Sequence, residues 1–123
     1  MKKTILTLFL LLLTLSLFTG CSKVDDATIL SAHQAVSNGA VIIDVRSPKE
    51  YKGKHVQNAI NIPVEEIVKS VARVPKNRTL VVYCRSGSRS SHAASILRKK
   101  GWQVIDVTTQ GEYERKIEIK PAS

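Results

Sequence analysis

The chain has 123 residues, 43% of them hydrophobic and 24% charged, which predicts one globular domain with a single hydrophobic core. Nineteen Lys and Arg residues against ten Asp and Glu residues give a formal net charge of +9 at pH 7. This charge favours anionic partners, but the sequence carries no aromatic and basic motif of the kind that binds nucleic acid. We therefore expect small anions as ligands, and no DNA or RNA.

The first 20 residues are predicted to be an export signal. Lys2 and Lys3 precede an apolar run over 5–18 that is too short for a comfortable membrane span. The run ends in LFTGC, which resembles the lipobox of bacterial lipoproteins, so we expect cleavage before Cys21 and acylation of its thiol. Two or three acyl chains would anchor the protein in the cell envelope, facing the periplasm or the exterior. An ordinary secreted protein with an incidental Cys21 is the alternative.

We therefore predict three segments along the chain. These are a signal peptide over 1–20, a lipidated polar tether over 21–26 and a domain over 27–123. Loss of the two N-terminal lysines lowers the formal charge of the mature chain to +7. We expect the domain to be a monomer.

Helix signals recur along the domain. Ser31 is a good N-cap and Gly39 a stop signal, which predicts a short first helix between them. The segment SPKEYKGK, 47–54, predicts a second helix that opens with a capping box between Ser47 and Glu50. Further helices are expected near 64–74, over 90–100 and from 112 onward.

Apolar runs between the helices predict strands at 40–45, 59–63, 79–84 and 103–107. Continuous apolar strands that alternate with helices are typical of a parallel sheet covered on both faces, which is an α/β architecture of three layers. In such sheets ligands bind beyond the carboxyl ends of the strands. Side chains that follow a strand directly are therefore the first candidates for function.

The stretch YCRSGSRSSHAAS, 83–95, places Cys84 between the end of a strand and the start of a helix. Once the lipobox cysteine is acylated, this thiol has no intramolecular disulfide partner. The helix start, Arg85 and Arg89 favour a thiolate over a thiol, and Gly87 lets the loop turn backbone N–H groups inward as a nest for an anion. We interpret Cys84 as a catalytic thiolate. A solvated turn beside an inert, buried cysteine is the alternative.

This segment, together with IDVRSPKEY and AINIP upstream, resembles the rhodanese family of sulfurtransferases over about 27–107. The chain is most similar to single-domain exported members, of the phage shock protein E type. The resemblance implies a three-layer α/β/α domain with a central, mainly parallel five-stranded sheet. It implies transfer of a sulfane sulfur from a donor such as thiosulfate, through a cysteine persulfide, to cyanide or a thiol. It makes Cys84 the nucleophile, with a substrate-binding cradle of Arg85, Ser86, Gly87, Ser88 and Arg89.

Such a reaction needs few groups. The Cys84 thiolate attacks the outer sulfur of the donor, sulfite leaves, and inward N–H groups hold the persulfide. Arg85 and Arg89 would bind the dianion and stabilise the departing sulfite. Neither a metal nor an organic cofactor is required.

Loop length separates this chemistry from that of cysteine-dependent phosphatases. Those enzymes keep five residues between cysteine and arginine, but here the sixth residue after Cys84 is Ser90, and the arginine comes one position earlier, at Arg89. The shorter loop favours sulfur, and phosphatase or arsenate chemistry stays an alternative. Two others are a persulfide or redox relay that serves a protein partner and an idle binding module, although an idle module has no need of a reactive thiol.

The remaining polar residues are expected to be structural. Asp44 and Arg46 end a strand at the same edge and should pair with neighbouring backbone or with Glu50. His33 is expected on the surface, and Asn58 stands where the family has a glycine, a place at which asparagine tolerates a left-handed turn. After the last strand the family commonly has Gly-Gly and a tryptophan, whereas this chain has TTQGEYERKIEIKPAS.

Overall fold

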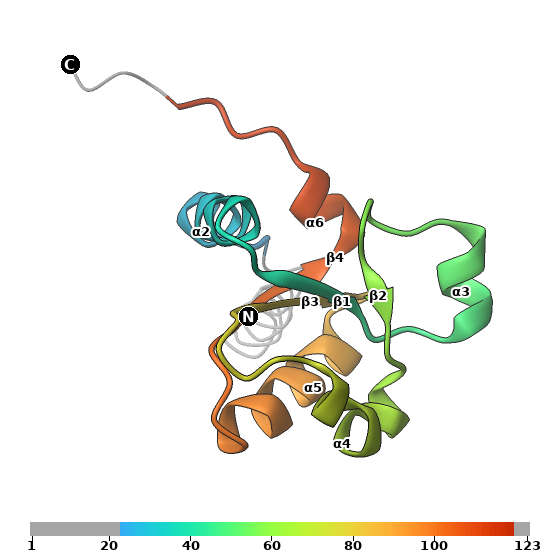
Figure 1. The fold of residues 1–123 in the computed structure, drawn as a ribbon. Helices are drawn as coiled ribbons and strands as arrows, with labels where there is room; N and C mark the ends of the chain where they lie inside the picture. Colours follow the sequence, from blue (N-terminus) through green and yellow to red (C-terminus); the bar gives the residue numbers. More distant parts are fainter. Residues whose placement is uncertain (1–22, 120–123) are drawn as a thin grey trace, which may run out of the picture.

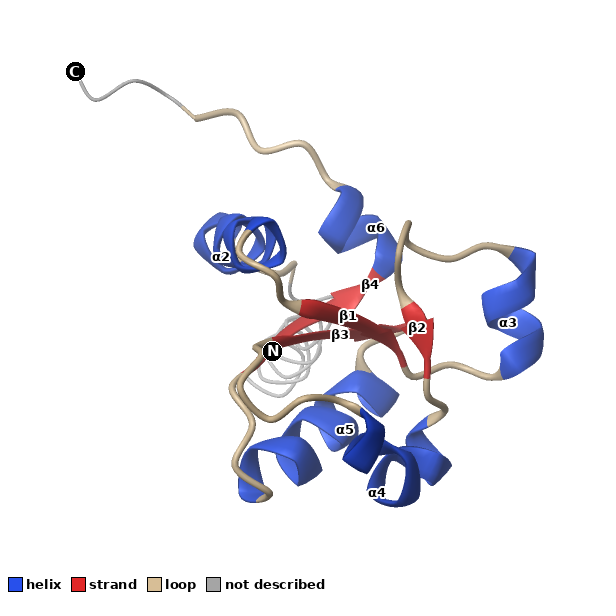
Figure 2. Ribbon diagram, viewed as in Figure 1, coloured by secondary structure: helices blue, strands red, loops and turns tan. Residues whose placement is uncertain are grey.

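The computed structural model describes residues 23–119, so the predicted signal peptide, the predicted lipidation of Cys21 and the last four residues lie outside the described residues. Four parallel strands form one sheet in the order β2-β1-β3-β4. Figure 2 shows the strands in a central layer with helices on both sides. The strands are β1 (Val41–Asp44), β2 (Ile60–Asn61), β3 (Leu80–Cys84) and β4 (Val104–Thr109).

The helices make the two outer layers of the predicted three-layer α/β/α domain, as Figure 1 shows. One layer contains α2 (Asp26–Ser37) and α6 (Gln110–Glu114), and the other contains α4 (Ile67–Ser70) and α5 (Ser88–Lys99). The short helix α3 (Pro48–Gly53) lies beyond β2, at the edge of the sheet. Single 3-10 turns, η1 (Val64–Glu66) and η2 (Val71–Arg73), flank α4.

The sheet differs from expectation in its number of strands. We expected five strands, and residues 23–119 form four. Only three described residues precede α2, so the described part of the chain has no strand before that helix, and β4 passes directly into α6. Residues 115–119 follow α6 without regular structure (Figure 1), and Ile117 among them packs against the core beneath α2 and α6.

Strand β3 lies between β1 and β4, and every residue of it is buried. Leu80, Val82 and Cys84 belong to the core beneath α4 and α5, while Val81 and Tyr83 belong to the core beneath α2 and α6. This is the alternation of a strand buried on both faces. Cys84 is therefore held by the most deeply packed strand, and its side chain points toward the layer that contains α5.

Several helix boundaries differ from the sequence expectation. α2 begins at Asp26 and not after Ser31, because Asp25 is the N-cap and Ile29 and Ala32 both face the core. The predicted helix over 64–74 is broken into η1, α4 and η2. Its many β-branched residues are poor helix formers, and a proline follows it.

The second predicted helix is confirmed as α3. The Ser47 hydroxyl accepts a hydrogen bond from the Glu50 backbone N–H at 3.2 Å, and the Ser47 N–H donates to the Glu50 carboxylate at 3.4 Å. Pro48 occupies the first turn, as expected. The capping box fixes the position of the Glu50 side chain at the carboxyl end of β1.

Candidate active site

Cys84 is the last residue of β3 and is only 1% exposed. Its sulfur accepts two backbone hydrogen bonds from the turn that follows: the Gly87 N–H lies at 3.0 Å and the Ser90 N–H at 3.3 Å. The turn thus wraps around the sulfur with its donors pointing inward. This is the anion nest that the sequence predicted, with the sulfur itself as its occupant.

The nest changes the acidity of the thiol. Burial alone raises the pKa of Cys84, but hydrogen bonds from the Ser90 hydroxyl and from the N–H groups of Ser90, Gly87 and Ser86 outweigh it. The net effect lowers the pKa of Cys84 below its ordinary value. A larger fraction of thiolate is therefore present near neutral pH than in a free cysteine, and the thiolate is the nucleophilic form.

Gly87 and Ser90 make the turn possible. Gly87 has a φ of 94°, in the region that favours glycine, and serves as the N-cap of α5, which therefore begins at Ser88 and not near Ser90. Ser90 is fully buried, and its hydroxyl also lies 3.1 Å from the Gly87 carbonyl. We did not predict a role for Ser90 beyond the helix start. The sequence indicated this role only through the position of Ser90 directly after Arg89.

Arg89 does not lie free over the sulfur. Its Nη1 is 2.8 Å from Glu50 Oε1 and its Nη2 is 3.1 Å from Glu50 Oε2, a two-armed ion pair between α5 and α3. The hydrogen bonds from Arg89 lower the pKa of Glu50 to about 2. Cys84 also contributes to raising the pKa of Arg89, so the guanidinium lies within electrostatic range of the sulfur. Glu50 is a residue of this site that the sequence assigned only to the helix cap.

The rest of the predicted cradle faces solvent. Arg85, Ser86 and Ser88 are exposed, and Gly87 is partly exposed. A cavity of about 580 Å³ opens beside the turn, with Arg85, Ser86 and Gly87 on one side. The remainder of its wall comes from Lys23 and from the end of β4 and the start of α6, namely Thr108, Thr109 and Glu112. The cavity is large enough for a small anion and an acceptor.

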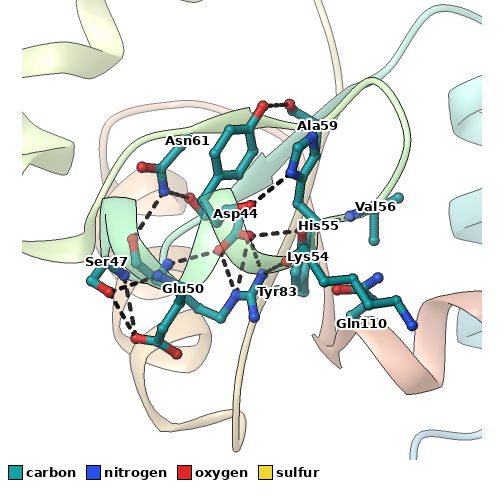
Figure 3. A network of polar contacts seen from close by, with 12 residues as sticks. Asp44, Ser47, Glu50, Lys54, His55, Val56, Ala59, Asn61, Tyr83 and Gln110 are labelled. Carbon is teal, nitrogen blue, oxygen red and sulfur yellow. Dashed lines mark hydrogen bonds and ion pairs between the residues drawn. The ribbon is translucent and has the colours of Figure 1, made fainter.

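A buried polar network supports the carboxyl ends of β1 and β3, as Figure 3 shows. The Tyr83 hydroxyl donates to Asp44 Oδ2 at 2.8 Å and accepts from the Val56 N–H at 3.0 Å. Arg46 binds the Asp44 carboxylate through Nε and Nη2, and its Nη2 also donates to the Lys54 carbonyl. Asp44 is fully buried, so these bonds satisfy its charge. Arg46 and Asp44 thus pair with each other and with neighbouring backbone, as expected for the backbone, and Glu50 pairs with Arg89 instead.

Three further expectations can be compared with the structure. Asn58 has a φ of 65°, which confirms the left-handed turn. His33 is not simply on the surface, because its Nε2 lies 2.6 Å from the Tyr113 carbonyl and its ring meets the Tyr113 ring edge to face. The C-terminal helix begins at Gln110 and not at Glu112, since the Thr109 hydroxyl caps it.

The N-terminal end of the described chain is fastened beside the cysteine loop. Arg115 donates to the Val24 carbonyl at 2.7 Å and forms ion pairs with Asp26 and Glu112. Val24 is partly buried against the core beneath α2. Within the segment that we assigned to a polar tether, Val24 thus packs on the domain, whereas Lys23 and Asp25 are exposed.

Within 23–119, no group of three or more His, Cys, Asp or Glu side chains is placed to hold a metal ion. No helix in the same range is both long and apolar enough to cross a membrane.

Comparison with known proteins gives consistent matches. Residues 27–111 match the family described as rhodanese-like domain. The chain is 46% identical over 66 residues to the thiosulfate sulfurtransferase PspE of Escherichia coli (strain K12), covering 52% of this chain and 64% of that relative. It is 32% identical over 77 residues to a sulfurtransferase of Allochromatium vinosum, covering 63% of this chain and 72% of the relative.

Solved structures agree. A rhodanese with anions from E. coli is 36% identical, with a TM-score of 0.59 over 63% of this chain and 95% of that one. A rhodanese-related protein from Thermoplasma volcanium is 26% identical, with a TM-score of 0.61 over 70% of this chain and 87% of that one. The matched region contains β1 to β4 and the cysteine turn.

Proposed function

The chain belongs to the rhodanese-like domain family, and from this premise we propose that it is a sulfurtransferase that carries sulfur as a persulfide on Cys84. The single observation that carries the proposal is the sulfur of Cys84 held by the Gly87 and Ser90 N–H groups at the end of β3. Donors that already surround one sulfur, with the Ser86 N–H beside them, are suited to hold a second sulfur anion bonded to it.

The transfer is written in two steps. The Cys84 thiolate attacks the outer sulfur of a sulfane donor such as thiosulfate; an S–S bond forms to Cys84, and the bond to the sulfonyl sulfur breaks with its electron pair, releasing sulfite. An acceptor then attacks the outer sulfur of the persulfide and leaves with it, returning Cys84 as a thiolate. Cyanide would leave as thiocyanate, and a thiolate would leave as a persulfide. Neither step needs an external oxidant.

Thiosulfate as donor is supported by charge. Arg85 is exposed on the rim of the 580 Å³ cavity, and Arg89 lies within electrostatic range of Cys84. Both can meet a dianion at the turn, where the start of α5 adds its partial positive charge. The named activity of PspE, at 46% identity over 66 residues, points to the same donor.

We also propose that the protein works in the cell envelope, anchored by acylation of Cys21. The support is the sequence: a short apolar run that ends in LFTGC. The test is incorporation of a labelled fatty acid by the full chain in a bacterial host. Label is expected in the wild type and absent in Cys21→Ala; label retained by Cys21→Ala would refute the anchor.

The enzyme proposal is tested by intact mass. The purified chain is incubated with thiosulfate and freed of excess donor, and its intact mass is measured. Cyanide is then added, and the thiocyanate that forms is measured. We expect a gain of one sulfur atom, lost again with stoichiometric thiocyanate, in wild type and in Cys21→Ala but not in Cys84→Ala. A wild type that gains no sulfur, or a Cys84→Ala variant that turns over at the wild-type rate, would refute it.

The same experiment separates the enzyme from a relay. A relay would take up the sulfur but release it slowly to cyanide and rapidly to a particular protein thiol. Turnover of cyanide that keeps pace with persulfide formation supports the enzyme. Turnover of an aryl phosphate at the rate of thiosulfate would instead support the phosphatase alternative.

A further inference from the structure

Thr108 has an unusual backbone conformation for its residue type. Its φ is 61°, in the left-handed region, where a β-branched side chain is crowded. Such a conformation is strained and persists only where the surroundings hold it. Glycine would adopt this conformation without strain, and the segment here departs from the Gly-Gly that the related family commonly has after the last strand.

Specific contacts hold Thr108 in place. Its N–H donates to Asp106 Oδ1 at 2.9 Å, closing a short turn within β4. Opposite β3 the register shifts here: Val82 pairs with Asp106, but Cys84 pairs with Thr109, so β4 carries one extra residue. A bulge of this kind re-aims a side chain at the end of a strand. The chain thus keeps a threonine in a strained position directly beside the strand end that carries Cys84.

The side chain of Thr108 meets the cysteine turn. A Cβ placed on Gly87 would lie 3.2 Å from Thr108 Cβ and 3.5 Å from Thr108 Cγ2, so the threonine fills the space in front of Gly87. Gly87 is the residue whose N–H holds the Cys84 sulfur at 3.0 Å. Thr108 and Gly87 line the same 580 Å³ cavity. The threonine therefore lies in the wall of that cavity, directly next to Gly87.

We propose that Thr108 is a specificity-determining residue that narrows the approach to the Cys84 sulfur and so favours small sulfur acceptors over bulky thiols. The role as acceptor filter rests on the sulfurtransferase function proposed above. The geometric part, a wall that restricts access to the thiol, does not. A hydroxyl is not needed for this role, and the volume of the side chain is what matters.

The test compares two reagents of different size that alkylate the thiol. Iodoacetamide and a fluorescein maleimide are reacted with the purified chain, and modification of Cys84 is followed by peptide mass so that Cys21 does not interfere. Thr108→Gly, which removes the wall and suits the left-handed backbone, is expected to raise the ratio of maleimide to iodoacetamide rates by about tenfold. Thr108→Val keeps the volume and should leave the ratio within about twofold of wild type.

Two outcomes would overturn the proposal: an unchanged ratio in Thr108→Gly, or an equal rise in Thr108→Val, which would assign the effect to the hydroxyl. Because alkylation needs no sulfur transfer, the wall is tested even if no persulfide forms. When persulfide does form, the preference for cyanide over glutathione in kcat/KM should fall in Thr108→Gly in step with the alkylation ratio. A preference that stays at the wild-type value would overturn the filter.

Discussion

Arg89 and Glu50 join the turn after β3 to the helix after β1 through two nearly parallel hydrogen bonds of 2.8 and 3.1 Å. Glu50 is held at the same time by the capping box with Ser47. The guanidinium is therefore fixed in direction before any substrate arrives. An anion that binds at the turn meets an arginine whose position is set by its carboxylate partner.

Replacing Arg89 with alanine is expected to raise the KM for thiosulfate by about tenfold, because a charge-assisted contact to the dianion is lost. Persulfide should still form at saturating donor, since Gly87 and Ser90 hold the sulfur. Steady-state thiocyanate assays over a range of thiosulfate measure this. Lys99→Ala, an exposed cation at the far end of α5, is the control. Loss of all persulfide in Arg89→Ala would show that Arg89 organises the turn itself.

Glu50 should make stability depend on pH in the acid range. Its pKa falls from an ordinary 4.5 to about 2 through the hydrogen bonds from Arg89. Below about pH 4.5 Glu50 is protonated in the unfolded chain, whereas in the folded chain it stays ionised down to about pH 2. The stabilisation that the ion pair with Arg89 provides is therefore lost as the pH falls through that window. Urea midpoints at pH 6, 4 and 3 should decline less in Glu50→Gln than in wild type. Glu65→Gln, on an exposed carboxylate, should retain the wild-type decline.

Ser90→Ala is expected to raise the pKa of Cys84, because the mutation removes one of the hydrogen bonds that lower it. Backbone donation from position 90 remains, so the effect is partial. The pH dependence of iodoacetamide labelling at Cys84 gives the pKa directly, and its midpoint should move upward. Ser91→Ala, on the exposed neighbour, is the matched control. Equal midpoints in wild type and Ser90→Ala would contradict the role assigned to the hydroxyl.

Tyr83→Phe should destabilise the fold by about 1–3 kcal/mol, because buried polar groups lose a partner. The Val56 N–H loses its acceptor, and the fully buried Asp44 carboxylate loses a donor. Urea unfolding measures the loss. Tyr51→Phe, which removes a partly buried hydroxyl bound to the Ala59 carbonyl, should cost about 1 kcal/mol. Equal losses of unfolding free energy in the two variants would show that the hydrogen bonds of Tyr83 to Asp44 and Val56 stabilise the fold no more than a single partly buried hydrogen bond does.

Gly87→Ala and Gly39→Ala separate backbone strain from crowding. Both glycines have positive φ, 94° and 98°, so each alanine should cost about 1 kcal/mol for the backbone. Only the Cβ at position 87 meets a neighbour, Thr108 at 3.2 Å, and nothing lies within 4 Å at position 39. Unfolding should therefore show a larger loss for Gly87→Ala. Adding Thr108→Gly to Gly87→Ala should restore the extra stability that the crowding removes. If the double variant is no more stable than Gly87→Ala, contact with Thr108 is not the cause of the extra loss.

The layers of the fold and the place of the cysteine were predictable, because each rests on a local pattern. A run of β-formers ends at Cys84, and small residues at helical spacing follow it, which predicts a strand, a turn and a helix. The capping box of Ser47 and Glu50 is another pattern confined to a few residues, and it is confirmed.

The relationships across the fold were not predictable from one sequence. The pairing of Arg89 with Glu50 joins positions 39 residues apart, and the bulge in β4 depends on its register with β3. The two-residue length of β2 likewise depends on its pairing with β1. The sequence showed only that the segment after the last strand departs from the family's Gly-Gly, and the left-handed conformation of Thr108 requires the structure.

The contact between Arg115 and the Val24 carbonyl holds the start of the described chain on the domain, and this limits how far the domain can lie from a bilayer to which Cys21 is anchored. Lys23 lines the cavity beside the cysteine turn, and two residues of extended chain span at most about 7 Å. If Cys21 carries the lipid proposed above, the Lys23 side of the cavity lies close to the headgroups. Compounds concentrated at the membrane surface would then have a short path to the cysteine turn.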